Sequence, residues 1–258
     1  MSAALRSVDS LFDDSVRPPG LHLLLLEWRA LFEGAFSLLS YPLGVAQPRG
    51  DGHSVLVVPG FLAGDPATSL LRRFLSDRGY DAVPWGLGTN IRYDRDAVDR
   101  LSSKVRMLAA ASGRSVSIVG WSLGGVLARN VALEEPQHIR QVITLGSPFT
   151  ANFRASNARL LFELLNGHRM EELDLWLLAA AKQQLAVPST AVYTKSDGIV
   201  NWRCCVHENP GPLETNVRVI GSHCGLPCNP LVIALLDEIL ARPQEALRLP
   251  STPEFDLS

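Results

Sequence analysis

The fold is decided by residues 115–128, which read Ser115-Val-Ser-Ile-Val-Gly-Trp-Ser-Leu-Gly-Gly-Val-Leu-Ala128. The first residues are a β-branched apolar run that predicts a buried strand, and those after Ser122 begin a helix. The turn between them is so sharp that Ser122 must take a strained backbone conformation, which side chains two residues away would obstruct. Gly120 and Gly124 remove that obstruction. Ser122 Oγ is therefore expected to stand clear of the sheet at the positive end of the helix.

Around this segment, β-branched apolar runs alternate with stretches of helical periodicity. This order predicts an α/β fold with a largely parallel central sheet and helices on both faces. The expected strands cover residues 54–58, 80–85, 115–119, 141–145, 190–194 and 217–220. The expected helices cover residues 67–77, 94–111, 123–133 and 231–240.

The interval between Pro148 and Pro188 breaks this alternation. It holds two helical patterns, over 157–165 and 171–184, and no strand. An insertion of this kind fits a small helical cap, about residues 149–187, over the edge of the sheet where ligands bind. A plain crossover helix with a long lead-in is the alternative.

The segment Leu21–Ser40 has helical periodicity but few polar residues. Leucine, phenylalanine and tryptophan fill most of its surface, with Glu27 as an exception. Its narrow polar stripe consists of His22, Arg29, Glu33, Ser37 and Ser40. Such a helix can pack against the domain, cover an apolar mouth or lie on a membrane surface, and packing is expected. We expect residues 1–20 to be flexible and 21–258 to form one domain.

A serine at its ordinary pKa is a weak nucleophile and needs a base that an acid orients. Of the six histidines, His223 alone follows a predicted strand and precedes a helix, which puts it at the same sheet edge as Ser122. Asp197 also follows a strand, and Gly198 is expected to free the backbone of its turn. The chain order of serine, aspartate and histidine is typical of this arrangement. Asp174, in the expected cap, is the rival acid.

An acyl-transfer intermediate needs two backbone N–H groups to hold its negative charge. One is expected from Leu123, directly after Ser122. The other is expected from Phe61, because Gly60 lets the loop after the first strand turn its amide inward. Apolar residues near these loops are the expected substrate contacts. They are Leu62, Trp121 and Phe149.

Composition and charge exclude several other classes of protein. The chain has 258 residues, enough for one domain, and 24 Lys and Arg against 26 Asp and Glu give a formal net charge of −2. No nucleic-acid partner is therefore expected. The first 19 residues carry three aspartates and no long apolar run. This is unlike a secretory signal, so a cytoplasmic location is expected.

The four cysteines, at positions 204, 205, 224 and 228, lack the two-residue spacing typical of zinc sites. We expect free buried thiols. The alternatives are a metal site and a disulfide that joins the pair at 204 and 205 to the pair at 224 and 228. The chemistry expected of Ser122 needs no metal or organic cofactor.

Taken together, the motifs resemble the α/β-hydrolase superfamily and are most similar to bacterial lipases and esterases. The matching motifs are Pro59-Gly60-Phe61, Gly120-Trp-Ser-Leu-Gly-Gly125, Thr144-Leu-Gly-Ser-Pro148, Ser196-Asp-Gly-Ile-Val200 and Ser222-His-Cys-Gly225. They cover residues 54–240, and their order and spacing are jointly specific. The resemblance implies the same roles as above, with Ser122, Asp197 and His223 catalytic. It also implies an oxyanion hole at Phe61 and Leu123.

The sequence thus predicts a serine hydrolase that cleaves a hydrophobic carboxylic ester through an acyl-enzyme. A thioesterase or an acyltransferase would use the same three residues and differ in the leaving group or the acceptor. A non-catalytic ligand-binding protein with a hydrolase fold is the alternative from another class.

Overall fold

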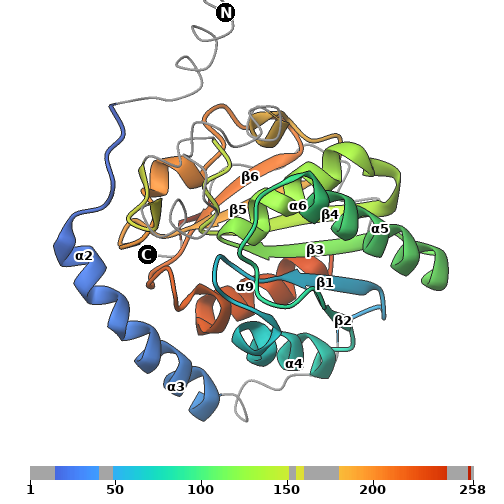
Figure 1. The fold of residues 1–258 in the computed structure, drawn as a ribbon. Coiled ribbons are helices and arrows are strands. Elements are labelled where there is room, and N and C mark those ends of the chain that lie inside the picture. The colour runs from blue at the N-terminus through green and yellow to red at the C-terminus, as the bar shows by residue number, and fades with distance from the viewer. Residues whose placement is uncertain (1–14, 41–48, 151–154, 160–179, 243–254, 257–258) are drawn as a thin grey trace, which may run out of the picture.

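A parallel sheet organises the part of the chain that this computed structural model describes, which is residues 15–40, 49–150, 155–159, 180–242 and 255–256. The strand order is β2-β1-β3-β4-β5-β6-β7, and all pairings are parallel (Figure 1). The strands are β1 (Ser54–Val58), β2 (Asp81–Pro84), β3 (Val116–Trp121), β4 (Ile139–Leu145), β5 (Ser189–Tyr193), β6 (Glu214–Arg218) and β7 (Phe255–Asp256). The predicted α/β architecture is confirmed.

β1 to β5 begin and end within two residues of their predicted positions, β6 is displaced, and the short β7 was not predicted. The apolar run at 217–220 predicts a strand there, but β6 begins three residues earlier, at Glu214. Its polar residues can lie in the sheet because they have buried partners. Glu214 pairs with the ring of His207, and Asn216 exchanges two hydrogen bonds with the His207 backbone. Ile220 lies past the strand and is 55% exposed.

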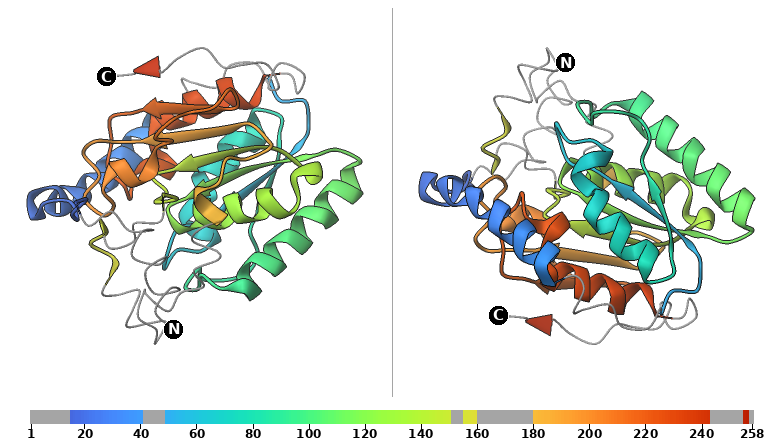
Figure 2. Two further views of the ribbon diagram at one scale, coloured as in Figure 1. Left: turned by 90° about the horizontal axis from the view of Figure 1, so that it is seen from above. Right: turned by 90° about the horizontal axis from the view of Figure 1, so that it is seen from below.

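Helices cover both faces of the sheet. Among the described residues these are α4 (Ser69–Asp77), α5 (Arg95–Ser112), α6 (Leu123–Glu134) and α9 (Pro230–Leu240). α5 and α6 lie on one face, and α4 and α9 on the other (Figures 1 and 2). Asp94 caps α5 by accepting the Ala97 N–H, and Gly113 ends it with a φ of 66°. Short 3-10 turns occupy Asp65–Thr68, Pro136–His138, Trp202–Cys205 and Leu226–Cys228.

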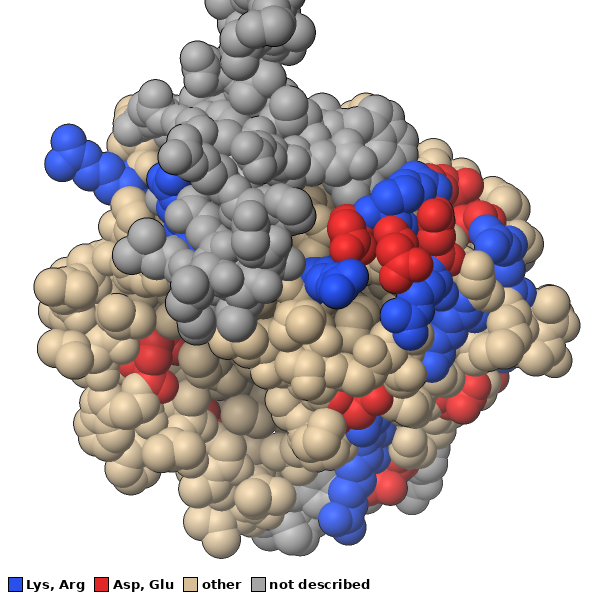
Figure 3. Space-filling view, viewed as in Figure 1, with Lys and Arg blue, Asp and Glu red and all other residues tan. Residues whose placement is uncertain are grey.

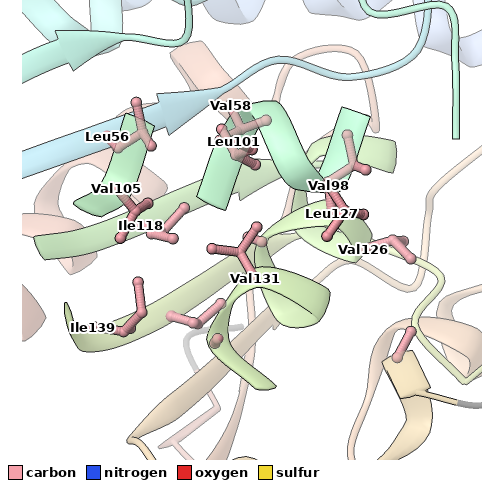
Figure 4. Packing of buried hydrophobic residues seen from close by; sticks show 14 of the residues in the cluster. Leu56, Val58, Val98, Leu101, Val105, Ile118, Val126, Leu127, Val131 and Ile139 are labelled. Atoms are coloured by element: carbon pink, nitrogen blue, oxygen red, sulfur yellow. The ribbon is translucent and has the colours of Figure 1, made fainter. Parts of the chain in front are cut away.

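Each face of the sheet packs its own hydrophobic layer, because successive side chains along a strand point to opposite faces. Leu56 and Val58 of β1 join the layer under α5 and α6 (Figure 4). Val55 and Val57 join the layer under α4 and α9. β3 lies between β1 and β4, so the strand that leads to Ser122 is held from both sides.

The N-terminal helical region packs the opposite way from expectation. α2 (Leu21–Leu25), a 3-10 turn (Leu26–Arg29) and α3 (Ala30–Ser40) follow one another along the edge of the domain (Figure 2). We call this segment the N-terminal helix. Its polar side faces inward, where Arg29 Nη2 lies 2.7 Å from each of the carbonyl oxygens of Ser196 and Gly221.

The apolar side of the N-terminal helix faces outward. Nine of its large side chains are 41–78% exposed: Leu21, Leu25, Leu26, Trp28, Leu31, Phe32, Phe36, Leu38 and Leu39. Figure 3 shows few charged side chains over α2 and α3, whereas charges gather over α5 and α6. The expectation that the apolar stripe would pack into the core is wrong, because buried polar contacts attach this helix instead.

The expected flexible segment (1–20) and cap (149–187) lie largely outside the described residues, as does Asp174. Where both are described they lie side by side, since Asn157 Nδ2 donates to the Pro19 carbonyl at 3.1 Å. None of the described helices is both long enough and apolar enough to cross a membrane.

Candidate active site

Ser122 stands at the turn between β3 and α6. Its φ of 52° and ψ of −123° are costly for any residue other than glycine. A Cβ on Gly120 would lie 2.4 Å from Cα of Gly125. A Cβ on Gly124 would lie 2.4 Å from the Val58 carbonyl oxygen. The predicted strained turn, and its need for the two glycines, are confirmed.

The structure brings His223 and Asp197 to this serine. His223 Nε2 lies 3.0 Å from Ser122 Oγ, and His223 Nδ1 lies 2.6 Å from Asp197 Oδ2. Asp197 follows β5 and His223 follows β6, so the three side chains meet at the carboxyl edge of the parallel sheet. His223 and Asp197 are each 3% exposed. The imidazole thus touches the serine hydroxyl on one side and a shielded carboxylate on the other.

Backbone N–H groups orient the carboxylate of Asp197. Its Oδ1 accepts hydrogen bonds from Ile199 N–H at 2.8 Å and Val200 N–H at 2.7 Å. These bonds satisfy a buried charge and leave Oδ2 facing the imidazole.

The electrostatic surroundings favour the protonated form of His223. Burial by itself would lower the pKa of His223, because an imidazolium is poorly solvated inside the domain. The charge of Asp197, its hydrogen bond to Nδ1 and the charge of Glu27 outweigh burial and raise the pKa of His223. His223 is therefore suited to accept the proton of Ser122.

The loop after β1 lies directly against Ser122. A Cβ on Gly60 would lie only 3.1 Å from Cβ of Ser122. Glycine is therefore needed there for close approach, while the positive φ of this loop, 61°, occurs at Leu62. Asn90 holds the loop, since its side chain donates to the Pro59 carbonyl at 2.7 Å and its carbonyl accepts the Leu62 N–H at 2.8 Å.

Both expected oxyanion donors lie on segments next to Ser122. Phe61 belongs to the loop that Asn90 holds against the serine. Leu123 is the first residue of α6. The first N–H groups of a helix have no acceptor within the helix, so they are available to a ligand.

The three expected substrate contacts have different surroundings. Leu62 is 44% exposed on the loop whose Gly60 lies against Ser122. Trp121 Nε1 donates to the His223 carbonyl at 3.1 Å, so this indole supports the loop that carries His223. Phe149 is 2% exposed, with its ring 4.2 Å from the Arg129 guanidinium and 4.9 Å from the His207 ring. Phe149 therefore belongs to the core and offers little surface for a substrate.

Gly146 is a site residue that the sequence analysis did not single out. Its φ is 57°, and a Cβ on it would lie 3.1 Å from His223 Nδ1 and 3.4 Å from Asp197 Oδ2. Only a residue without a side chain fits beneath this pair. The motif Thr144-Leu-Gly-Ser-Pro148 contains this glycine, but its need to be a glycine comes from side chains of two other loops.

Gly198 has a different role from the one predicted. Its φ lies outside the left-handed region, so it does not serve to free the turn. A Cβ on it would lie 2.3 Å from the Leu23 carbonyl oxygen. Gly198 is required because α2 approaches the loop of Asp197 this closely.

Two of the rival histidines, His53 and His207, have structural partners. His53 Nε2 lies 2.8 Å from Ser117 Oγ, and His207 Nδ1 lies 3.2 Å from Glu214. All four cysteines are free thiols, with Cys204 and Cys205 buried and Cys224 exposed. Within the described residues, no group of three or more His, Cys, Asp or Glu side chains is arranged to hold a metal ion.

Comparison with known proteins agrees with this architecture. A family model described as the alpha/beta hydrolase fold matches residues 58–164. Bacillus licheniformis lipase BlEst2 in its mature form is 18% identical, with a TM-score of 0.54 over 73% of this chain and 92% of that one. A structure of the metagenome-derived lipolytic enzymes LipS and LipT is 13% identical, with a TM-score of 0.57 over 74% and 94%.

A third similar structure, Aspergillus fumigatus lipase B, is 17% identical with a TM-score of 0.53, and the match covers 81% of this chain but 56% of that one. A search of curated protein sequences found no match. At these identities the structural likeness concerns the fold. The parallel sheet and the strained serine turn are both features of this fold. The chain therefore has the α/β-hydrolase fold, and the family model matches its residues 58–164.

Proposed function

We propose that this chain is a serine hydrolase that cleaves carboxylic esters with a hydrophobic acyl group. One observation carries the proposal, namely the line of hydrogen bonds from Ser122 Oγ through His223 to Asp197. Ser122, the first residue of this line, has a positive φ that is unfavourable for serine. Folds retain such strain mainly where a side chain must be presented for function.

The proposed reaction has two halves. His223 takes the proton of Ser122 as Oγ attacks the ester carbonyl, and the N–H groups of Phe61 and Leu123 hold the oxyanion. The C–O bond to the alcohol then breaks, and the alcohol leaves with the proton from His223. Water, which gives a proton to His223, attacks the acyl-enzyme. The acid is released and the proton returns to Ser122 Oγ.

A hydrophobic substrate is favoured by the surface around the nucleophile. Leu62 is 44% exposed on the loop that lies against Ser122, and Trp121 lies between that loop and His223. The similar structures include proteins whose titles name lipases and lipolytic enzymes. A chain-length series of nitrophenyl esters, run beside acyl thioesters of the same lengths, would separate esterase from thioesterase activity.

We also propose that the N-terminal helix contacts a neutral lipid surface. The helix lies beside the loops after β5 and β6, where Asp197 and His223 are found, and its apolar side chains are exposed. The inward polar contacts prevent the helix from turning its apolar side into the domain. The outward face is composed of leucine, phenylalanine and tryptophan, so its binding would depend on apolar contact more than on charge.

Labelling with a fluorophosphonate probe tests the proposed chemistry. Wild type should label and Ser122→Ala should not, because the substitution removes one hydroxyl and leaves the fold intact. Labelling of both proteins, or of neither, would contradict the assignment of Ser122.

Sedimentation with phosphatidylcholine vesicles tests the lipid contact. The full chain should sediment with the vesicles at high and low salt alike. Failure to bind, together with elution as a dimer that buries the helix, would assign the apolar face to a second copy of the chain.

A further inference from the structure

Glu27 of the N-terminal helix connects the loops that carry the acid and the base. Its Oε1 accepts the N–H of Gly198 at 2.7 Å and the N–H of His223 at 3.0 Å. Its Oε2 accepts the N–H of Cys224 at 2.9 Å. The residue is 9% exposed. One buried carboxylate therefore binds the backbone of His223 itself and of the residue next to Asp197.

These contacts account for the burial of the charged side chain of Glu27. A carboxylate shielded from water is stable only when hydrogen bonds replace its hydration, and three N–H donors do so here. The donors lie 171 to 197 residues away in the chain. The contact therefore specifies where the helix docks on the domain.

Neighbouring residues of the helix extend the same contact. Arg29 donates to the carbonyls of Ser196 and Gly221, one on each loop. Glu33 Oε1 accepts the N–H of Ser222 at 2.9 Å. Among these side chains, Glu27 is the one that binds the backbone of His223.

We infer that Glu27 is a positioning residue that sets the placement of His223 relative to Asp197 by holding both loops on one carboxylate. The inference rests on the proposed hydrolase function, and Glu27 touches neither the nucleophile nor the position of the ester. Direct bonds also join the loops, such as Thr194 Oγ1 to the Gly221 carbonyl at 2.9 Å. Glu27 differs from them because it acts at the backbone of the base.

The charge of Glu27 gives this role a measurable signature. The charged or titratable groups around His223 are Asp197 after β5, Glu27, Arg29 and Glu33 on the N-terminal helix, and Cys224 on the same loop. Removing the charge of Glu27 lowers the pKa of His223. The acid limb of the pH profile, which is the rise of kcat/KM with pH at low pH, would then move to lower pH, because His223 acts as a base only when neutral.

The test uses Glu27→Gln and Glu27→Asp in the full chain. The amide of glutamine places a donor against one of the three N–H groups. We expect kcat to fall about 10- to 100-fold with KM nearly unchanged, since small misplacements of a catalytic group have effects of this size. The acid limb should move to lower pH in E27Q. E27D keeps the charge but is one methylene shorter, so kcat should fall while the limb stays near its wild-type position.

Asp237→Asn is the matched control. Asp237 is a buried carboxylate two turns along α9, with Oδ1 2.7 Å from Arg78 Nε. Its loss should lower thermal stability without moving the acid limb. A limb that moves equally in D237N and E27Q would overturn the inference, as would an E27Q enzyme with wild-type kcat and pH profile.

Amide hydrogen exchange separates this inference from the proposed function. Peptides containing Gly198 and His223–Cys224 should exchange faster in E27Q than in wild type or D237N. This readout does not require activity, so it applies even if the wild type fails to react with the fluorophosphonate. Unchanged exchange in these peptides would overturn the role of Glu27 whatever the catalytic result.

Discussion

The α5 helix and the N-terminal helix have similar periodicity and opposite packing. α5 buries Val98, Leu101 and Val105 and turns its charged residues outward, where Arg95 and Asp99 pair. The N-terminal helix buries Glu27 and Ser37 and turns leucine and phenylalanine side chains outward. Both segments are amphipathic, so periodicity alone does not determine which side is buried.

The difference lies in what each helix packs against. α5 lies on the face of a sheet, which presents apolar side chains and no free backbone groups. The N-terminal helix lies at the sheet edge, where the loops after β5 and β6 present backbone N–H and carbonyl groups. Polar side chains satisfy these groups, so the apolar side is left outside.

The largest expected effect on stability comes from a substitution in α5. Leu101→Ala removes a fully buried side chain and should lower the free energy of unfolding by about 2–5 kcal/mol, measured by urea denaturation. The matched change Leu31→Ala, at a residue 77% exposed, should alter it by about 0.5 kcal/mol or less.

An equal loss from the two substitutions would contradict the comparison. It would mean that Leu31 is buried in solution against another chain. Repeating the denaturation over a range of protein concentrations would detect that association.

Substituting one arginine in each helix should give a smaller difference in the free energy of unfolding. Arg29→Ala removes a donor that lies 2.7 Å from the carbonyls of Ser196 and Gly221, of which the Gly221 carbonyl keeps its bond from Thr194 Oγ1. We expect a loss of about 1–3 kcal/mol in the free energy of unfolding. Arg100→Ala on α5 removes only an exposed pair with Asp96 and should change it by less than about 0.5 kcal/mol. A similar small effect at both positions would show that the inward contacts of Arg29 do not attach the helix.

The pH dependence of kcat/KM in the wild type tests the inward face of the N-terminal helix, which carries Glu27. The pKa of His223 is raised, and Glu27 contributes to the shift. In the proposed mechanism the neutral imidazole is the base, so kcat/KM should rise with pH through a midpoint above the value near 6.5 that is usual for histidine. The measurement is a pH profile of kcat/KM with a nitrophenyl ester. A midpoint clearly below that value would contradict the arrangement of charges around the imidazole.

The strand-to-helix turn could be predicted from the sequence because its constraints are local. A strained serine needs small residues at fixed offsets, and Gly120 and Gly124 display that need in the sequence. Asp197 and His223 were predictable for a related reason. Each follows a strand of a parallel sheet, and all such strands end at one edge.

The contacts of Glu27 and Gly146 could not be predicted in the same way. Glu27 interacts with residues more than 170 positions away, and nothing near it in sequence records their unsatisfied N–H groups. Gly146 is required by side chains from two other loops. A glycine or a lone acidic residue in the sequence indicates a close contact, but the residue that makes the contact is known only from the fold.

A double substitution with a small expected effect on stability is the most informative about the outward face. Leu31→Gln combined with Leu39→Gln changes side chains that are 77% and 78% exposed, so the free energy of unfolding should change by less than about 1 kcal/mol. Turnover of a short soluble ester should also be unchanged, because neither residue touches the inward contacts. Binding to phosphatidylcholine vesicles should fall, since two large apolar groups are lost from the contact. Retained vesicle binding with unchanged stability would mean that another surface meets the lipid. A loss of ester turnover in solution would mean that the two sides of the helix are not independent.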